Sequence, residues 1–169
     1  MIRGDVRAKI RDVFNLFEYQ PLRSYEVSDW NELGEAIGEW ISEDVVRKAV
    51  LFANGWTIIL DPEMVMPDDD RLCSEVAAAL GTEIVTTIYS ADFVSGFFVF
   101  DPELRRAYET FQGTVKLDRG EPLPVETTMH LGRLNASDLL RFLASFGVDY
   151  SALENLHPFQ IWELGEPAG

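Results

Sequence analysis

Carboxylates are the side chains of this sequence that are best placed to do chemistry. Five of them fall within ten residues: Asp61, Glu63, Asp68, Asp69 and Asp70. Oxygen-rich loops of this kind bind hard cations such as Ca²⁺. The spacing matches no EF-hand, however, and Pro62 and Pro67 stiffen the segment. Capping of a following helix is the simpler explanation, because acidic side chains are stabilising at a helix N-terminus. We therefore predict no metal site here.

Histidine and cysteine, the usual bases and nucleophiles, are scarce: the chain has two histidines and a single cysteine. Cys73 lies on the apolar face of a predicted helix, where a buried thiol is the expected state. His130 lies in a proline-rich segment and could act as a base with Glu126 or Asp118. A small-ligand-binding protein or hydrolase-like enzyme with a pocket near His130 is therefore the alternative function.

Motifs that mark common catalytic sites are missing from the sequence. There is no Gly-x-Ser-x-Gly nucleophile turn, no glycine-rich phosphate loop and no His-Glu-x-x-His pair. We accordingly predict no catalytic residues, no cofactor and no metal ligands. The sequence favours a binding protein over an enzyme.

Charge is the strongest compositional signal. The 169 residues include 29 acidic and 14 basic side chains, giving a net charge of −15. Such a chain is repelled by nucleic acid and by anionic membrane surfaces, so we exclude both as partners. Residues 61–104 contain ten acidic residues and one basic residue, which concentrates a charge of −9 in about a quarter of the chain. A charge distribution of this kind would steer association with a basic protein surface.

The predicted partner-binding residues follow from this charge and from one aromatic side chain. A row of glutamates lies away from the apolar stripe of a predicted helix that begins at Ser28 or Asp29, and it forms either a solvated face or a docking surface. Trp162, in an apolar tail flanked by proline, is a candidate anchor at an interface, although packing of this tail on the rest of the protein is the favoured interpretation. The full predicted set is Glu35, Glu39, Asp68, Asp69, Asp70 and Trp162.

Helical and strand patterns indicate an α+β fold in one domain over residues 1–169. Apolar spacing predicts helices over residues 5–17, from 28 or 29 onward, over 69–80 and over 136–146. Asn54-Gly55 between two apolar runs predicts a hairpin of strands 49–53 and 56–60. Further strands are expected over residues 83–89, 93–100 and 104–111, with a loop over 112–133 that holds a short strand at 114–117. We predict a mainly antiparallel sheet of five to six strands, packed with N-terminal, central and C-terminal helices.

Two segments carry a resemblance to a known class of proteins. One is the hairpin Asn54-Gly55-Trp56-Thr57-Ile58-Ile59-Leu60-Asp61, followed by an acid-capped helix. The other is the strand written Ser95-Gly96-Phe97-Phe98-Val99-Phe100-Asp101. Together they resemble small acidic bacterial α+β proteins, some of which serve as immunity proteins of polymorphic toxin systems. The resemblance extends over roughly residues 45–125 and lies in the layout of elements. It implies a toxin-neutralising protein that docks a basic partner.

Compartment and assembly follow from the two ends of the chain. The N-terminal residues lack the apolar segment of a secretory signal, and a lone cysteine suits a reducing compartment. We therefore expect a cytoplasmic protein. The tail over residues 157–164 is too apolar to be loose, so it should pack as an extended segment or edge strand. A homo-oligomer formed through this tail is the remaining alternative.

Overall fold

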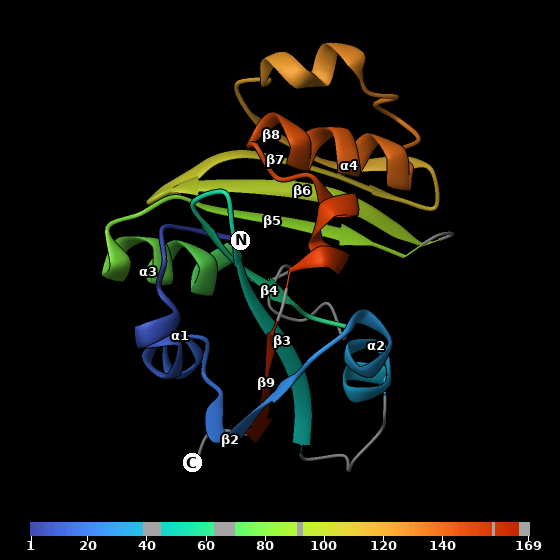
Figure 1. The fold of residues 1–169 in the computed structure, drawn as a ribbon. Coiled ribbons are helices and arrows are strands. Elements are labelled where there is room, and N and C mark those ends of the chain that lie inside the picture. The colour runs from blue at the N-terminus through green and yellow to red at the C-terminus, as the bar shows by residue number, and fades with distance from the viewer. Residues whose placement is uncertain (39–44, 63–69, 91–92, 157, 166–169) are drawn as a thin grey trace. The chain divides into compact units, whose positions relative to one another are not determined.

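The computed structural model describes residues 1–38, 45–62, 70–90, 93–156 and 158–165 (Figure 1). The chain divides into two compact units. The first unit comprises residues 1–66 and 151–169, and the second comprises residues 67–150. Both mix helices with antiparallel strands, which confirms the α+β class. The expected single domain over residues 1–169 stays a prediction.

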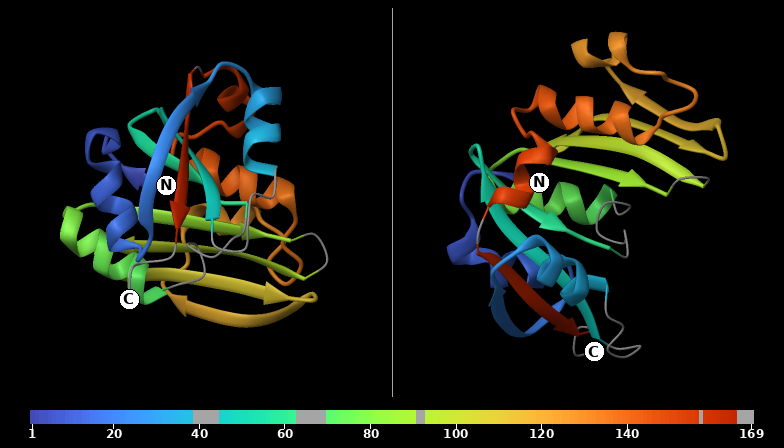
Figure 2. Two further views of the ribbon diagram at one scale, coloured as in Figure 1. Left: turned by 90° about the horizontal axis from the view of Figure 1, so that it is seen from below. Right: turned by 45° about the vertical axis from the view of Figure 1, so that its right-hand side comes forward.

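The first unit contains five of the strands, in the order β2-β9-β3-β4-β1. Figures 1 and 2 show β9, in red, between β2 and β3. The elements of this unit are β1 (Ile2–Arg3), a 3₁₀ turn η1 (Arg7–Lys9), α1 (Ile10–Leu16), β2 (Gln20–Val27), α2 (Trp30–Gly38), β3 (Val45–Ala53), β4 (Trp56–Leu60) and β9 (Phe159–Gly165). The 3₁₀ segment η4 (Tyr150–Asn155) leads into β9.

The β3–β4 hairpin confirms the predicted turn. Asn54 and Gly55 both adopt positive φ, at 50° and 82°. That conformation matches the twist of the flanking strands and is tolerated best by asparagine and glycine. Val50 pairs with Ile59 and Leu51 with Ile58, so two apolar runs lie side by side. The turn residues therefore set the register of the hairpin.

Strand β9 is covered on both faces, which explains why the tail is so apolar. Phe159 contacts Trp30 of α2 with ring centroids 5.8 Å apart. Trp162, three residues later and so on the opposite face, contacts Phe14 of α1 at the same distance, 5.8 Å. The tail is thus a central strand of its unit, and β2 is the edge strand in its place.

The second unit is a four-stranded antiparallel meander, β5-β6-β7-β8, with a helix on each face (Figure 2, right). Phe97 of β6 stacks on Phe142 of α4 at 4.3 Å, while α3 contacts β6 and β7. Residues alternate between faces along a strand, so β6 is buried on both sides. The elements are α3 (Asp70–Leu80), β5 (Ile84–Tyr89), β6 (Val94–Asp101), β7 (Glu103–Phe111), β8 (Thr114–Gly120), a 3₁₀ segment η3 (Pro124–Thr128) and α4 (Ala136–Ser145).

The predicted number of strands is too low, because the described residues form nine rather than five or six. The prediction did not include β1, which has only two residues, or β2. The segment expected to be mostly loop begins instead with β8, which pairs with β7 along its length. The helices expected over residues 69–80 and 136–146 are confirmed as α3, described from Asp70 onward, and α4. No helix within the described residues is long and apolar enough to cross a membrane.

Candidate functional site

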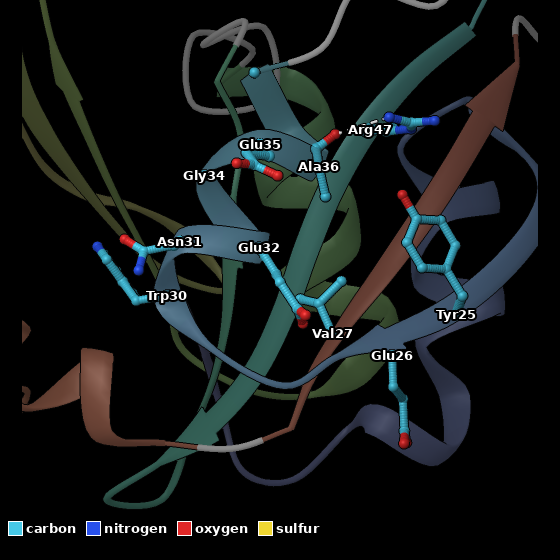
Figure 3. Close-up of a pocket in the computed structure, with 11 residues that line it drawn as sticks. Tyr25, Glu26, Val27, Trp30, Asn31, Glu32, Gly34, Glu35, Ala36 and Arg47 are labelled. Atoms are coloured by element: carbon cyan, nitrogen blue, oxygen red, sulfur yellow. Dashed lines mark hydrogen bonds between the residues drawn. The ribbon is translucent and has the colours of Figure 1, made fainter.

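The candidate site is an open groove of the first unit, which we call the acidic groove (Figure 3). Its volume is about 1420 Å³. Strand β2 forms one side, helix α2 forms the other, and β3 contributes a single arginine. The described lining residues are Tyr25, Glu26, Val27, Trp30, Asn31, Glu32, Gly34, Glu35, Ala36, Gly38 and Arg47.

Helix α2 begins where local capping directs it to begin. The Asp29 carboxylate accepts hydrogen bonds from the backbone N–H groups of Asn31 and Glu32, at 2.8 and 2.9 Å. The Glu32 carboxylate reaches back and accepts from the backbone N–H and the hydroxyl of Ser28, each at 2.8 Å. These bonds satisfy donors that have no partner within the helix. Leu33, only 1% exposed, then fixes the apolar side of the helix in the core.

Arg47 is the one cation among the described groove residues, and it is fully engaged (Figure 3). Its Nη1 donates to the carbonyl oxygen of Ala36 in α2 at 3.1 Å. Its Nη2 donates to Oε1 of Glu163 in β9 at 3.0 Å. The guanidinium also lies 6.0 Å from the ring centroid of Tyr25. Arg47 therefore ties α2 to the strands and leaves no free positive charge in the groove.

Glu163 is the counter-ion that fixes Arg47. Its side chain is only 7% exposed, and it also accepts a 2.9 Å bond from Nη2 of Arg23 in β2. The hydrogen bonds from Arg23 and then from Arg47 outweigh the effect of burial and hold the pKa of Glu163 below its usual value. A carboxylate with two guanidinium partners stays ionised at neutral pH. The cluster is thus a structural tie across β2, β9, β3 and α2.

The remaining carboxylates of the groove are uncompensated. Glu26 and Glu35 are exposed, and within the described residues neither has an ion-pair or hydrogen-bond partner. Figure 3 shows Glu35 projecting from α2, whereas Glu26 points away from that helix, on the face of β2 opposite to Tyr25 and Val27. Glu32 keeps its negative charge while it caps α2, because its partners are neutral donors. The groove consequently presents a net negative surface to solvent.

The structure describes three of the six predicted partner-binding residues. Glu35 lies on the acidic groove, as an exposed side chain of the first unit. Asp70 begins α3 in the second unit and is half-buried. Glu39, Asp68 and Asp69 lie outside the described residues. Asp61, from the same acidic stretch as Asp68–Asp70, is an internal counter-ion: its Oδ1 lies 2.5 Å from Nζ of the fully buried Lys48.

Trp162 is packed within the first unit and is not an exposed anchor, in agreement with the favoured interpretation of the tail. Its side chain is 7% exposed and packs on Phe14, because β9 runs between two strands and beneath α1. Phe159, Ile161 and Leu164 are each 0% exposed. The first unit itself therefore covers the apolar tail, which offers no apolar surface over residues 159–164 to a second copy.

His130 does not meet the partners predicted for it. Glu126 and Asp118 are both bound to the buried guanidinium of Arg106, with N···O distances of 2.5 Å. His130 Nδ1 lies instead 3.1 Å from Oδ1 of Asp138, which caps α4. The histidine side chain is 73% exposed and lines neither the acidic groove nor the hollow beside Tyr89 and Phe93. The two partners that the alternative enzyme site assigned to His130 are therefore engaged by Arg106 instead.

Two residues that form the groove, Tyr25 and Arg47, were missed in the sequence analysis. Tyr25 belongs to β2, where the side chains of Pro21, Tyr25 and Val27 are less exposed than those of Leu22, Ser24 and Glu26. In the sequence, only Tyr25 and Val27 alternate with polar residues, and Leu22 is out of phase with them, so the strand has only a short local signal. No sequence signal links Arg47 to Glu163, which lies 116 residues later.

Neither metal chemistry nor a known relative gives the groove a function. Within the described residues, no three His, Cys, Asp or Glu side chains converge as a metal site requires. Comparison of the chain with protein-family models, with curated proteins and with solved structures found no match. The function must therefore be inferred from the site itself.

Proposed function

We propose that the protein is a non-enzymatic binding domain that docks a basic protein surface through the acidic groove. The observation behind this proposal is the state of the charges. The one cation described in the groove is ion-paired with Glu163, a carboxylate that it shares with Arg23. Glu26 and Glu35 face solvent with no partner among the described residues, so the described lining carries more carboxylates than guanidinium groups. Lysine or arginine side chains of a partner would supply the missing positive charge.

Apolar contacts in the groove would provide most of the affinity for a partner, and the carboxylates would raise the association rate and the selectivity. Each exposed ion pair contributes only about 0–1 kcal/mol, so the carboxylates alone provide weak affinity. Tyr25, Val27 and Trp30 are half-buried at the same groove and offer apolar and aromatic surface. Complementary charge raises the association rate and rejects acidic competitors. The combination suits a basic partner with an apolar residue between its cations.

The side chains of the groove favour binding over catalysis. The described lining residues include no histidine, cysteine, serine or lysine, the usual nucleophiles and bases. A toxin-neutralising protein that covers the active site of a basic toxin domain is the narrower form of the proposal. This narrower form rests on the resemblance in layout to immunity proteins.

A titration of the isotope-labelled full chain with a decalysine peptide tests the proposal. We expect amide chemical-shift changes to concentrate on residues 25–38 of β2 and α2. The double variant Glu26→Gln/Glu35→Gln should weaken binding about three- to tenfold, because two exposed ion pairs are lost. The matched control is Glu121→Gln/Glu154→Gln, which removes two exposed carboxylates outside the groove and changes net charge equally.

The control double variant distinguishes binding at the acidic groove from a general attraction of the acidic chain to polycations. Binding through the groove leaves the control double variant within about twofold of the parent at physiological salt, since distant surface charges are screened. Equal weakening of both double variants, or shift changes spread evenly over both units, would contradict the proposal.

A further inference from the structure

A second hollow, which we call the aromatic pocket, lies within the second unit and differs in chemistry from the acidic groove. Its volume is about 630 Å³, within the range of about 300–1,000 Å³ typical of small-molecule sites. Strands β5, β6 and β7 contribute its floor, and the segment before α4 contributes its rim. Its lining includes Tyr89, Phe93, Ser95, Thr110, Arg133 and Asn135.

Strand register explains why this position is hollow. Tyr89 pairs with Ser95, and Ser95 pairs with Thr110, so the three lie in one row across the sheet. Two residues further along β6, Phe97 pairs with Tyr108, and that row is covered by Phe142 of α4. Helix α4 begins only after its cap, Asn135, and two of the three residues in the uncovered row are small. The pocket is therefore open because α4 does not extend over this row and because Ser95 and Thr110 have small side chains.

The floor of the aromatic pocket contains a polar group without a partner. Ser95 is 6% exposed, and within the described residues its hydroxyl forms no hydrogen bond. The neighbouring Thr110 hydroxyl donates to the Ser95 carbonyl oxygen at 3.2 Å and so satisfies a different atom. Because Ser95 lines the pocket, its hydroxyl is open to the pocket space and can exchange a hydrogen bond with a polar atom of a ligand.

Exposed aromatic rings form the wall of the aromatic pocket. The side chain of Phe93 is 58% exposed and that of Tyr89 is 41% exposed. Phe93 also meets Phe111 edge-on, with ring centroids 6.5 Å apart. Exposed rings at a concave site offer stacking area to a planar ligand.

Charge distinguishes this pocket from the rest of a strongly acidic chain. No carboxylate is found among its described lining residues, although the sequence contains 29 acidic side chains. Arg133 is exposed, and among the described residues its guanidinium has no ion-pair partner. A planar guanidinium binds a carboxylate through two parallel hydrogen bonds. The rim is therefore suited to an anion.

We infer that the aromatic pocket binds a small aromatic carboxylate, with its ring against Tyr89 and Phe93 and its carboxylate on Arg133. A polar atom of the ligand reaches the Ser95 hydroxyl on the floor. The same chemistry is presented by a free aromatic acid and by a peptide that ends in an aromatic residue. This inference uses no residue of the acidic groove and is independent of the function proposed above.

Titration of the full chain with 3-phenylpropionate, followed by amide chemical shifts, tests the inference. We expect saturable binding with a Kd on the order of 1 mM or tighter and shift changes centred on Tyr89, Ser95 and Thr110. The uncharged 3-phenylpropionamide and the ringless propionate should each bind at least about tenfold more weakly, because each lacks one of the two recognition elements.

Matched variants assign the two recognition elements. Arg133→Gln should weaken binding of 3-phenylpropionate about tenfold, while Arg119→Gln, which removes an exposed cation outside the pocket, should not. Phe93→Ala should weaken it several-fold, while Leu131→Ala, a truncation of another exposed apolar residue, should not.

Three results would overturn the inference. They are no saturable binding by a chain whose spectrum shows it folded, equal affinity for the acid and the amide, and equal effects of Arg133→Gln and Arg119→Gln. To separate the two ligand sources, a tripeptide Gly-Gly-Phe is compared with its C-terminal amide. Tighter binding of the tripeptide acid than of 3-phenylpropionate indicates peptide termini, and weaker binding indicates free aromatic acids.

Discussion

The acidic groove and the aromatic pocket each contain one arginine, and the two arginines are in opposite situations. Arg47 is 11% exposed in its side chain and bonds both Glu163 and the carbonyl of Ala36. Arg133 is exposed, with no ion-pair partner among the described residues. In the groove the arginine supports the structure and leaves carboxylates to face solvent. In the pocket the arginine itself faces solvent, so the two hollows select ligands of opposite charge.

This contrast teaches that the type of a lining residue does not fix the sign of a site. An arginine that is already paired contributes little positive potential, because its counter-ion lies at hydrogen-bond distance. An unpaired arginine at a rim without carboxylates keeps its potential even in a chain of net charge −15. Whether the arginine is ion-paired, rather than whether an arginine is present, therefore decides which sign of ligand charge each hollow favours.

The largest expected effect comes from removing the paired arginine. Arg47→Met should lower the free energy of unfolding by about 2–3 kcal/mol, because it deprives Glu163 and the Ala36 carbonyl of a buried donor. Arg23, 69% exposed, still partners Glu163 and limits the loss. Urea unfolding at neutral pH measures the change. Arg47→Lys should lose about 1 kcal/mol, since it keeps the charge but not the planar donor geometry. A loss below about 0.5 kcal/mol in Arg47→Met would show that Arg47 does not tie α2 to the strands.

The second effect is a pH dependence of the unfolding free energy that comes from Glu163 and its two arginines, Arg23 and Arg47. The pKa of Glu163 is lower in the folded chain than its ordinary value of 4.5, mainly because of the bonds from Arg23 and Arg47. A group with a lowered folded pKa stabilises the protein above its unfolded pKa and loses this contribution as pH falls through the folded pKa. Compared with the parent, Glu163→Gln should show a gap of about 1–2 kcal/mol in unfolding free energy near pH 7. The difference in unfolding free energy between the parent and Glu163→Gln should become smaller below about pH 4.5, because protonation of Glu163 removes the parent's advantage.

The control for this pH dependence is the unpaired arginine. Because Arg133 has no described carboxylate partner, the difference between Arg133→Gln and the parent should not change between about pH 3 and pH 7. Urea unfolding at matched pH values measures both gaps. If the difference in unfolding free energy between Glu163→Gln and the parent stays constant across that range, the ionised carboxylate is not stabilised by its arginines.

Local features of the fold were predictable from the sequence, and long-range pairings were not. Asn54-Gly55 determines its hairpin because both turn residues tolerate positive φ, and Asn135 with Asp138 determines the start of α4. Strand β2 has few apolar residues, because as an edge strand it is covered less than a central one. The central position of β9 depends on pairing with β2 and β3, both more than 100 residues earlier. No local pattern encodes such pairing.

The candidate site shows the same limit in its charges. The periodicity of its helix predicted that Glu35 is an exposed carboxylate, and the structure confirms this exposure. The charge of −9 over residues 61–104 is not a single surface of free carboxylates, however. Asp61 pairs with Lys48, and Glu83 lies 3.4 Å from Arg105. Both cations come from other segments of the chain, so a count along the sequence overstates the exposed charge.

A crossed titration makes the comparison between the two hollows sharper. Glu26→Gln/Glu35→Gln should weaken binding of decalysine about three- to tenfold and leave binding of 3-phenylpropionate unchanged. Arg133→Gln should weaken binding of 3-phenylpropionate. It should leave the affinity for decalysine unchanged or slightly raised, because one repelling cation is removed. Chemical-shift titrations of both variants with both probes measure the four affinities. If either variant alters both probes equally, the two hollows are not independent sites of opposite charge.

The smallest expected effect is on stability at the aromatic pocket. Arg133→Met should change the free energy of unfolding by less than about 0.5 kcal/mol, because an exposed side chain without described partners contributes little to the folded state. Urea unfolding of this variant beside Arg47→Met measures the contrast directly, since both changes replace arginine with the same side chain. A near-zero effect at Arg133, together with a loss of phenylpropionate binding, would assign this arginine to ligand recognition. A loss comparable to that of Arg47→Met would instead make Arg133 a structural residue and remove the distinction between the two hollows.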